Sequence, residues 1–218
     1  MLFSYPKAAF FGKVLPKNKI YLQAKPTKRI QDLFVREVDK ITWLYKLSKE
    51  TTNLSPGKEV LEIEIFHILL KEEPLHKDII STLDRAIPNP VIYEVEFENK
   101  IKSIAAFKRP NKKTSGKAVV DRHFESQWFK CDMQRDSLPT VLDLATLYKK
   151  LLEPLLPSHP HDGEDLASYA QRMEEIMKKT DELNMLEKRL KSEKQFNRKV
   201  ELNKKLKAKH TEIKSLLN

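Results

Sequence analysis

The residues of this chain best suited to chemistry are acids and a lysine near the ends of expected strands. They are Asp84, Glu94, Glu96, Lys108 and Glu125. In a metal-dependent nuclease of the restriction-endonuclease type, an Asp and a following Glu-x-Lys bind Mg²⁺ through carboxylates, and the Lys assists the attacking water. In a Glu-x-Lys motif ending at Lys108, Ala106 occupies the position of the Glu. Residues 98–100 do match Glu-x-Lys, but they fall in an expected turn. We therefore interpret Glu94 and Glu96 as the polar face of an amphipathic strand, and the nuclease remains an alternative.

Other candidate sites carry weaker signals. His159 and His161 flank a proline that hinders joint ligation of a metal, so we assign no metal and no other cofactor. The 114–117 run lacks the leading glycine and the following hydroxyl residue of a phosphate loop. Asp84 is interpreted as structural, paired with Arg85 or with a base on a neighbouring element. We expect no catalytic residue.

Charge is placed unevenly along the chain. Residues 188–214 hold eleven Lys/Arg and three Asp/Glu, and the first 31 residues hold seven bases and no acid. Basic segments attract polyanions, and nucleic acid is the commonest polyanion in a cytoplasm. The sequence therefore predicts non-specific nucleic-acid binding, DNA or RNA, through the following residues: Lys188, Arg189, Lys191, Arg198, Lys199, Lys204, Lys205, Lys207 and Lys209. The alternative is a solvated Lys-rich surface that binds no nucleic acid.

The first 154 residues have the pattern of an α+β body. Hydrophobic periodicity predicts a helix over 27–47, a helix near 79–87 and a helix over 140–152. Strands are predicted at 19–22, 60–70, 91–97, 101–108 and 122–129, with a hairpin turn near residues 98–100. We expect a mostly antiparallel sheet of four to five strands flanked by helices.

The end of the chain predicts a separate element. Pro154, Pro157, Pro160 and Gly163 mark a linker over 155–164, and 165–218 reads as one long basic coiled-coil-like helix. Its apolar seam is expected to form an oligomer interface: Met173, Ile176, Leu183, Leu190, Leu202, Leu206 and Ile213. Such a narrow stripe needs a partner helix, so a homo-oligomer is favoured. An antiparallel fold-back near residues 192–198, or a helix laid along nucleic acid, are the alternatives.

Cellular context follows from two features. One cysteine, Cys131, cannot form an intramolecular disulfide and favours a reducing cytoplasm. No apolar run is long enough to span a bilayer, and the first residues do not have the pattern of a secretory signal. We therefore expect a cytoplasmic protein with no membrane partner.

Three segments resemble a known bacterial family. They are 38–54 (with Val38-Asp39-Lys40-Ile41-Thr42-Trp43), 83–93 (with Pro88-Asn89-Pro90) and 124–128 (Phe124-Glu125-Ser126-Gln127-Trp128). The resemblance covers roughly residues 10–155 and points to an uncharacterised domain of unknown function. It implies gene clusters with methyltransferases and helicases like those of type III restriction–modification. It supplies no catalytic residues.

These observations favour a non-catalytic accessory subunit of a bacterial DNA-modification or anti-phage defence complex. It would dock protein partners, helicase or methyltransferase subunits among them, and contact nucleic acid through Lys and Arg. The alternatives are the metal-dependent nuclease and a purely structural oligomerisation protein.

Overall fold

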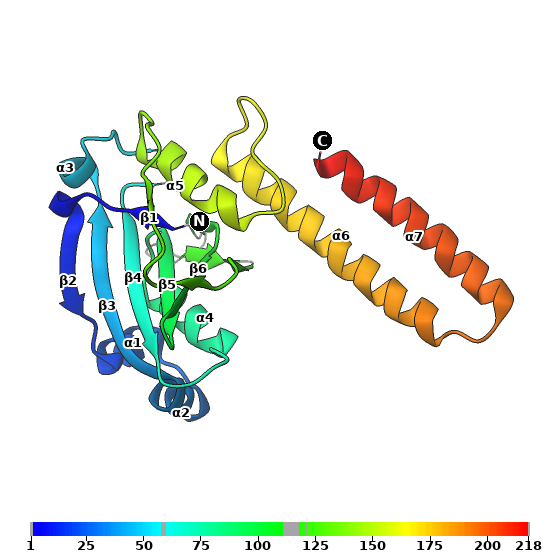
Figure 1. The fold of residues 1–218 in the computed structure, drawn as a ribbon, viewed down its shortest axis with the longest axis horizontal. Helices are drawn as coiled ribbons and strands as arrows, with labels where there is room; N and C mark the ends of the chain where they lie inside the picture. Colours follow the sequence, from blue (N-terminus) through cyan, green and yellow to red (C-terminus); the bar gives the residue numbers. More distant parts are fainter. Residues whose placement is uncertain (1, 58–59, 111–117, 121, 218) are drawn as a thin grey trace. The chain divides into compact units, whose positions relative to one another are not determined.

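The computed structural model describes residues 2–57, 60–110, 118–120 and 122–217. The chain divides into two compact units, Met1–Leu155 and Leu156–Asn218, drawn in Figure 1. The first is an α+β body and the second consists mainly of two long helices.

The body is built on a seven-stranded mixed sheet of order β10-β6-β5-β4-β3-β2, with β9 also paired to β6. Its strands are β2 (Phe10–Val14), β3 (Val38–Leu47), β4 (Ile63–Leu70), β5 (Val91–Phe97), β6 (Lys100–Ala105), β9 (Phe124–Glu125) and β10 (Phe129–Lys130). β4 and β5 run parallel because helix α4 (Lys77–Ala86) connects them as a crossover. The sheet is therefore mixed, which corrects the expected mostly antiparallel sheet of four to five strands.

Shorter elements complete the body. Two further strand pairs are β1 (Phe3–Ser4) with β11 (Asp136–Ser137), and β7 (Lys108–Pro110) with β8 (Ala118–Val120). The remaining helices are α1 (Lys17–Ala24), α2 (Lys28–Glu37), α3 (Lys49–Thr52) and α5 (Leu144–Leu152), with 3₁₀ turns η1 (Lys7–Ala9) and η2 (Glu153–Leu155).

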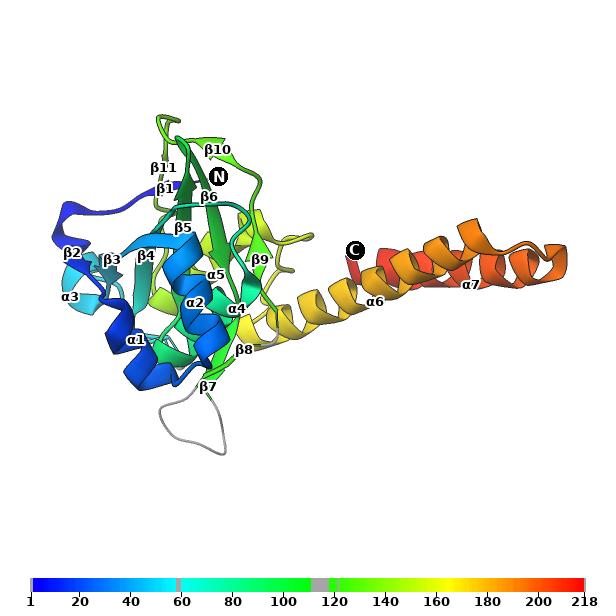
Figure 2. The same ribbon diagram turned by 90° about the horizontal axis from the view of Figure 1, so that it is seen from below.

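One hydrophobic core joins α1, α2 and α4 to the sheet (Figure 2). Phe34 of α2 and Leu83 of α4 are fully buried, as are Ile68 of β4 and Val95 of β5. Because side chains alternate along a strand, residues such as His67 and Glu94 point to the opposite face of the sheet. Polar groups are thus distributed over two distinct faces.

The predicted helix over 27–47 is wrong in its second half, because α2 ends at Glu37 and β3 begins at Val38. Lys17 stabilises this end by donating hydrogen bonds from Nζ to the carbonyl oxygens of Phe34 and Val38, at 2.9 and 2.5 Å. The following segment is rich in β-branched and aromatic residues, which favour a strand. Pairing with both β2 and β4 decides its conformation.

Other predicted elements compare as follows. The 91–97 strand is confirmed, and so is the hairpin turn, where Glu98 and Asn99 have φ of 44° and 63°, as in a type I′ turn. The helices near 79–87 and 140–152 are confirmed as α4 and α5, although α5 begins at Leu144, after its N-cap Asp143. The 19–22 strand is wrong, since these residues lie in helix α1. The 122–129 strand is replaced by the short β9 and β10.

The second unit is an antiparallel helical hairpin of α6 (Leu166–Ser192) and α7 (Phe196–Leu217). The expected single continuous helix is therefore wrong, and the alternative fold-back near 192–198 is what the structure contains. Within the described residues, no helix is long and apolar enough to cross a membrane.

Candidate functional site

The apolar seam predicted for an oligomer lies inside the helical hairpin. Met173, Ile176, Leu183 and Leu206 are buried, and Leu190, Leu202 and Ile213 are half-buried. Since α6 and α7 pack against each other, each helix supplies the partner surface that the other needs. The seam residues are thus used within one chain.

Ion pairs align the two helices. Lys179 of α6 contacts Glu212 of α7 at 2.7 Å, and Lys209 of α7 contacts Glu182 of α6 at 2.9 Å. Lys209 also contacts Glu212 at 3.1 Å. Hydrogen bonds to Glu182 and Glu212 raise the pKa of Lys209. Lys209, one of the nine Lys/Arg predicted to bind nucleic acid, therefore also links the two helices of the hairpin.

The other eight predicted basic residues are all exposed: Lys188, Arg189, Lys191, Arg198, Lys199, Lys204, Lys205 and Lys207. Among the described residues, no ion pair involves any of them. Six Lys/Arg and one acid occupy residues 188–199, around the turn that closes the hairpin. Arg198 and Lys199 also lie in the first turn of α7, where the helix dipole adds positive potential. This end of the hairpin, which we call the basic tip, carries a concentrated net positive charge.

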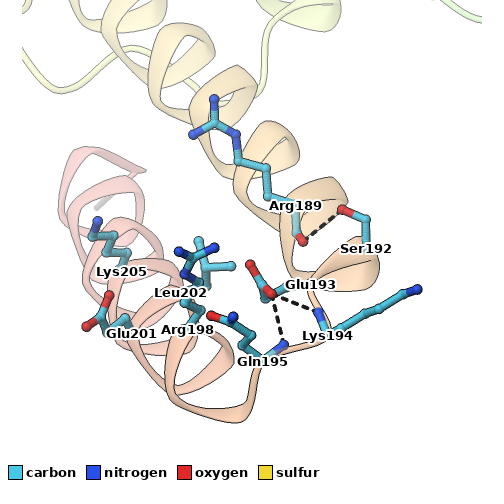
Figure 3. Close-up of a pocket in the computed structure, with 9 residues that line it drawn as sticks. All are labelled: Arg189, Ser192, Glu193, Lys194, Gln195, Arg198, Glu201, Leu202 and Lys205. Carbon is cyan, nitrogen blue, oxygen red and sulfur yellow. Dashed lines mark hydrogen bonds between the residues drawn. The ribbon is translucent and has the colours of Figure 1, made fainter.

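The turn over 193–195 contains no glycine or proline and depends on the Glu193 carboxylate. This group accepts hydrogen bonds from the backbone N–H groups of Lys194 and Gln195, at 2.8 and 2.9 Å. These bonds lower the pKa of Glu193. A surface pocket of about 610 Å³ lies beside the turn, and Arg189, Arg198 and Lys205 line it from the two helices (Figure 3).

Arg172 joins the segments at the other end of the hairpin. Its guanidinium contacts the Glu164 carboxylate at 2.7 Å and donates to the carbonyl oxygens of His159 and Leu216 at 2.9 and 3.1 Å. The hydrogen bond from Arg172 lowers the pKa of Glu164 to about 2. One side chain thus connects α6, the preceding loop and the end of α7.

The nuclease candidates of the body are arranged differently. Asp84 of α4 is buried and contacts Lys108 Nζ at 2.8 Å and His123 Nε2 at 2.5 Å. Tyr93 donates a hydrogen bond to the same carboxylate at 2.8 Å. Burial alone would raise the pKa of Asp84, but the bond from His123 and the charge of Lys108 lower it. Asp84 pairs with bases on neighbouring elements, whereas Arg85 donates to Thr82.

Glu64 of β4 is a second buried acid, on the face of the sheet that packs against α4. Asn89 donates to Glu62 and Glu64 at 2.6 and 2.7 Å, and so places the two carboxylates close together. Burial, opposed by the Asn89 hydrogen bond, raises the pKa of Glu64 to about 7. This acid takes up a proton near neutral pH.

The remaining nuclease candidates each contact a separate basic side chain. Arg135 forms a bidentate pair with Glu94 at 2.7 and 2.9 Å. Glu96 contacts His67 Nε2 at 2.7 Å, and Glu125 contacts Lys102. Of the five candidates, only Asp84 and Lys108 are brought together.

Glu94 and Glu96 line a pocket of about 390 Å³ on the sheet face opposite α4. His67, Cys131 and Arg135 also contribute to its wall. Burial and the charge of Glu96 raise the pKa of the Cys131 thiol, which keeps it protonated and a poor nucleophile. The pocket's acids are already engaged by Arg135 and His67.

Within the described part of the chain, no three His, Cys, Asp or Glu side chains are grouped as ligands for a metal ion. The 114–117 run lies outside the described residues. Sequence reasoning missed Tyr93, His123 and Arg135, because their partners are up to 41 residues away along the chain. The signal for them was the presence of acids in elements that must be buried, since a buried charge needs a partner.

The fold and these sites define an α+β body joined to a basic helical hairpin. A family model described as a domain of unknown function (DUF4391) matches residues 3–213, and the chain belongs to this family. The match includes the hairpin, which extends the resemblance beyond the expected residues 10–155. No curated protein and no solved structure matches the chain.

Proposed function

We propose that the helical hairpin binds the phosphate backbone of nucleic acid, and that the protein is a non-catalytic accessory subunit. The observation that carries the proposal is the set of eight exposed Lys/Arg, none of which is ion-paired among the described residues. Clustered like charges on a helix repel one another, and the phosphates of a nucleic acid would supply the opposite charge. A setting in DNA modification or anti-phage defence belongs to the proposal and rests on the sequence resemblance.

Binding through phosphates predicts two properties of the affinity. Affinity should be similar for different sequences, because phosphate contacts carry no base information. Affinity should also fall steeply with salt, because bound counterions are released from the nucleic acid.

A triple variant of the cations that line the pocket at the basic tip tests the proposal: Arg189→Gln, Arg198→Gln and Lys205→Gln. Fluorescence anisotropy with labelled oligonucleotides should show weaker binding of every sequence. The slope of log K against log salt should flatten by about 3 if each side chain contacts one phosphate of a duplex. The matched control removes three exposed lysines of the body: Lys49→Gln, Lys77→Gln and Lys130→Gln.

The control should bind like the wild type if the tip is the site. Equal weakening of binding by both triple variants would mean that the net charge of the protein, and not the position of these cations, determines the affinity. Tight binding by the tip variant would contradict the proposal. Recovery of the protein from its native host, followed by identification of co-purifying helicase or methyltransferase subunits, tests the accessory role.

A metal-dependent nuclease is the second candidate, and the contact between Asp84 and Lys108 is the observation that favours it. It is weaker because Glu94, Glu96 and Glu125 are held by other partners. Incubation with Mg²⁺ or Mn²⁺ should leave plasmid, linear and single-stranded DNA intact. Reproducible cleavage that disappears in a folded Lys108→Ala, Glu94→Ala or Glu96→Ala variant would favour the nuclease.

A further inference from the structure

The basic tip also carries an exposed aromatic side chain. Phe196, the first residue of α7, is 78% exposed, whereas the seam residue Leu206 on the same helix is 8% exposed. Lys194 and Arg198 lie two residues to either side of it in sequence, and both are exposed. A phenyl ring this exposed contributes little to the hairpin's own packing.

Aromatic rings beside Lys and Arg are typical of surfaces that bind single strands. An unpaired base has a free face that can stack on the ring, while the cations hold its phosphates. In a duplex the bases are already stacked on one another, so a phenyl ring gains little there. The pocket of about 610 Å³ beside the same turn, lined by Arg189, Arg198 and Lys205, offers space for a nucleic-acid backbone.

We propose that the basic tip prefers unpaired nucleotides and that Phe196 stacks on a base. This inference rests on the proposed nucleic-acid binding and adds the strand type that is recognised. A duplex is held by the cations alone, and a single strand is held by the cations and the ring together.

Phe196→Ala in the full chain tests the stacking role. The probes are a labelled 20-nucleotide single strand of mixed sequence, as DNA and as RNA, and the corresponding DNA duplex. The variant should bind single strands about tenfold more weakly and should bind the duplex as the wild type does. A loss on single-stranded DNA or single-stranded RNA, with duplex binding unchanged, supports the proposal and shows which of the two is bound.

Two further variants sharpen the test. Phe196→Trp keeps a stacking ring, so it should retain single-strand affinity, and its added fluorescence should be quenched on binding. Met185→Ala is the matched control, because Met185 is a 55%-exposed apolar residue of α6. The control should bind every probe like the wild type.

The results separate this inference from the proposed function. If the wild type binds no probe, the proposed function fails and this inference fails with it. If the wild type binds but Phe196→Ala binds single strands equally well, or loses duplex binding to the same extent, only the stacking role is overturned. The stacking role is also overturned if Phe196→Ala loses binding to anionic lipid vesicles alone.

Discussion

Asp84 carries a negative charge in the interior of the body, and three side chains stabilise it. Lys108 supplies the opposite charge, while His123 and Tyr93 supply hydrogen bonds. Burial lowers the pKa of Lys108, and the charge of Asp84 opposes this effect. Neither ion of such a pair can lose its partner without leaving an uncompensated charge away from water.

The first prediction concerns this pair. Asp84→Asn should lower the free energy of unfolding by about 3–5 kcal/mol, because Lys108 remains buried without its counter-charge. The double variant Asp84→Asn, Lys108→Met should recover part of the loss, since it removes both charges. Urea denaturation at pH 7 measures both. Strictly additive losses would contradict the pairing.

The second prediction concerns Glu64, whose pKa rises from an ordinary 4.5 to about 7 in the folded protein. The folded state binds this proton more tightly than the unfolded state, so its contribution to stability is full below pH 4.5 and is lost as pH rises through 7. Glu64→Gln should therefore be more stable than the wild type at pH 8, by about 2 kcal/mol, and similar to it at pH 5.

Denaturation of wild type and Glu64→Gln at both pH values gives the difference directly. Glu125→Gln is the control, since Glu125 is an exposed strand acid. The control should not change the pH dependence. A Glu64→Gln variant that is equally destabilised at pH 5 and pH 8 would show that the carboxylate is ionised throughout.

At the scale of elements, the sequence correctly predicts a helix or strand where its hydrophobic pattern and the residues at its ends indicate the same structure. β5 alternates clearly, and α4 ends before a proline and an asparagine. The prediction of one helix over 27–47 was wrong in its second half because the apolar spacing there fits both a helix and a strand. Its outcome depends on Lys17 and on the two neighbouring strands, which no local pattern contains.

The sequence did not decide between one continuous helix and a hairpin over the last 54 residues, for a related reason. A chain reversal without glycine or proline gives no ordinary turn signal, and here Glu193 closes the turn through its side chain. The basic residues of the candidate site were visible in the sequence as a charge cluster. The sequence could not separate Lys209, which is ion-paired across the hairpin, from its exposed neighbours.

The third prediction belongs to the open end of the hairpin. Arg172→Met should speed hydrogen exchange in the last turns of α7, because the variant loses the bonds to Glu164 and to the Leu216 carbonyl. Lys178→Met is the control, since Lys178 is an exposed cation of the same helix. Unchanged exchange in Arg172→Met would mean that apolar packing alone holds this end.

The wild type should show the same loosening in acid. The pKa of Glu164 lies at about 2, so the stability from the Arg172 contact is present above pH 4.5 and is lost as pH falls towards 2.

At the scale of the whole molecule, the fourth prediction concerns mass. The seam residues pack inside one chain, so light scattering at micromolar concentration should give the mass of a monomer. This expectation differs from the homo-oligomer that the seam suggests in sequence. A dimeric mass for the wild type that falls to a monomer in Leu206→Asp would restore the oligomer interface.

The turn at Glu193 has a consequence for exchange between copies. Residues 193–195 suit a helix as well as a turn, because the segment contains no helix breaker. If the carboxylate releases the backbone N–H groups, α6 and α7 can join into one straight helix with an open seam. Two such chains can then place α7 of one on α6 of the other, which is a domain-swapped dimer. We expect this exchange at high protein concentration and in Glu193→Ala, where the basic residues of the turn would lie in the middle of a long rod.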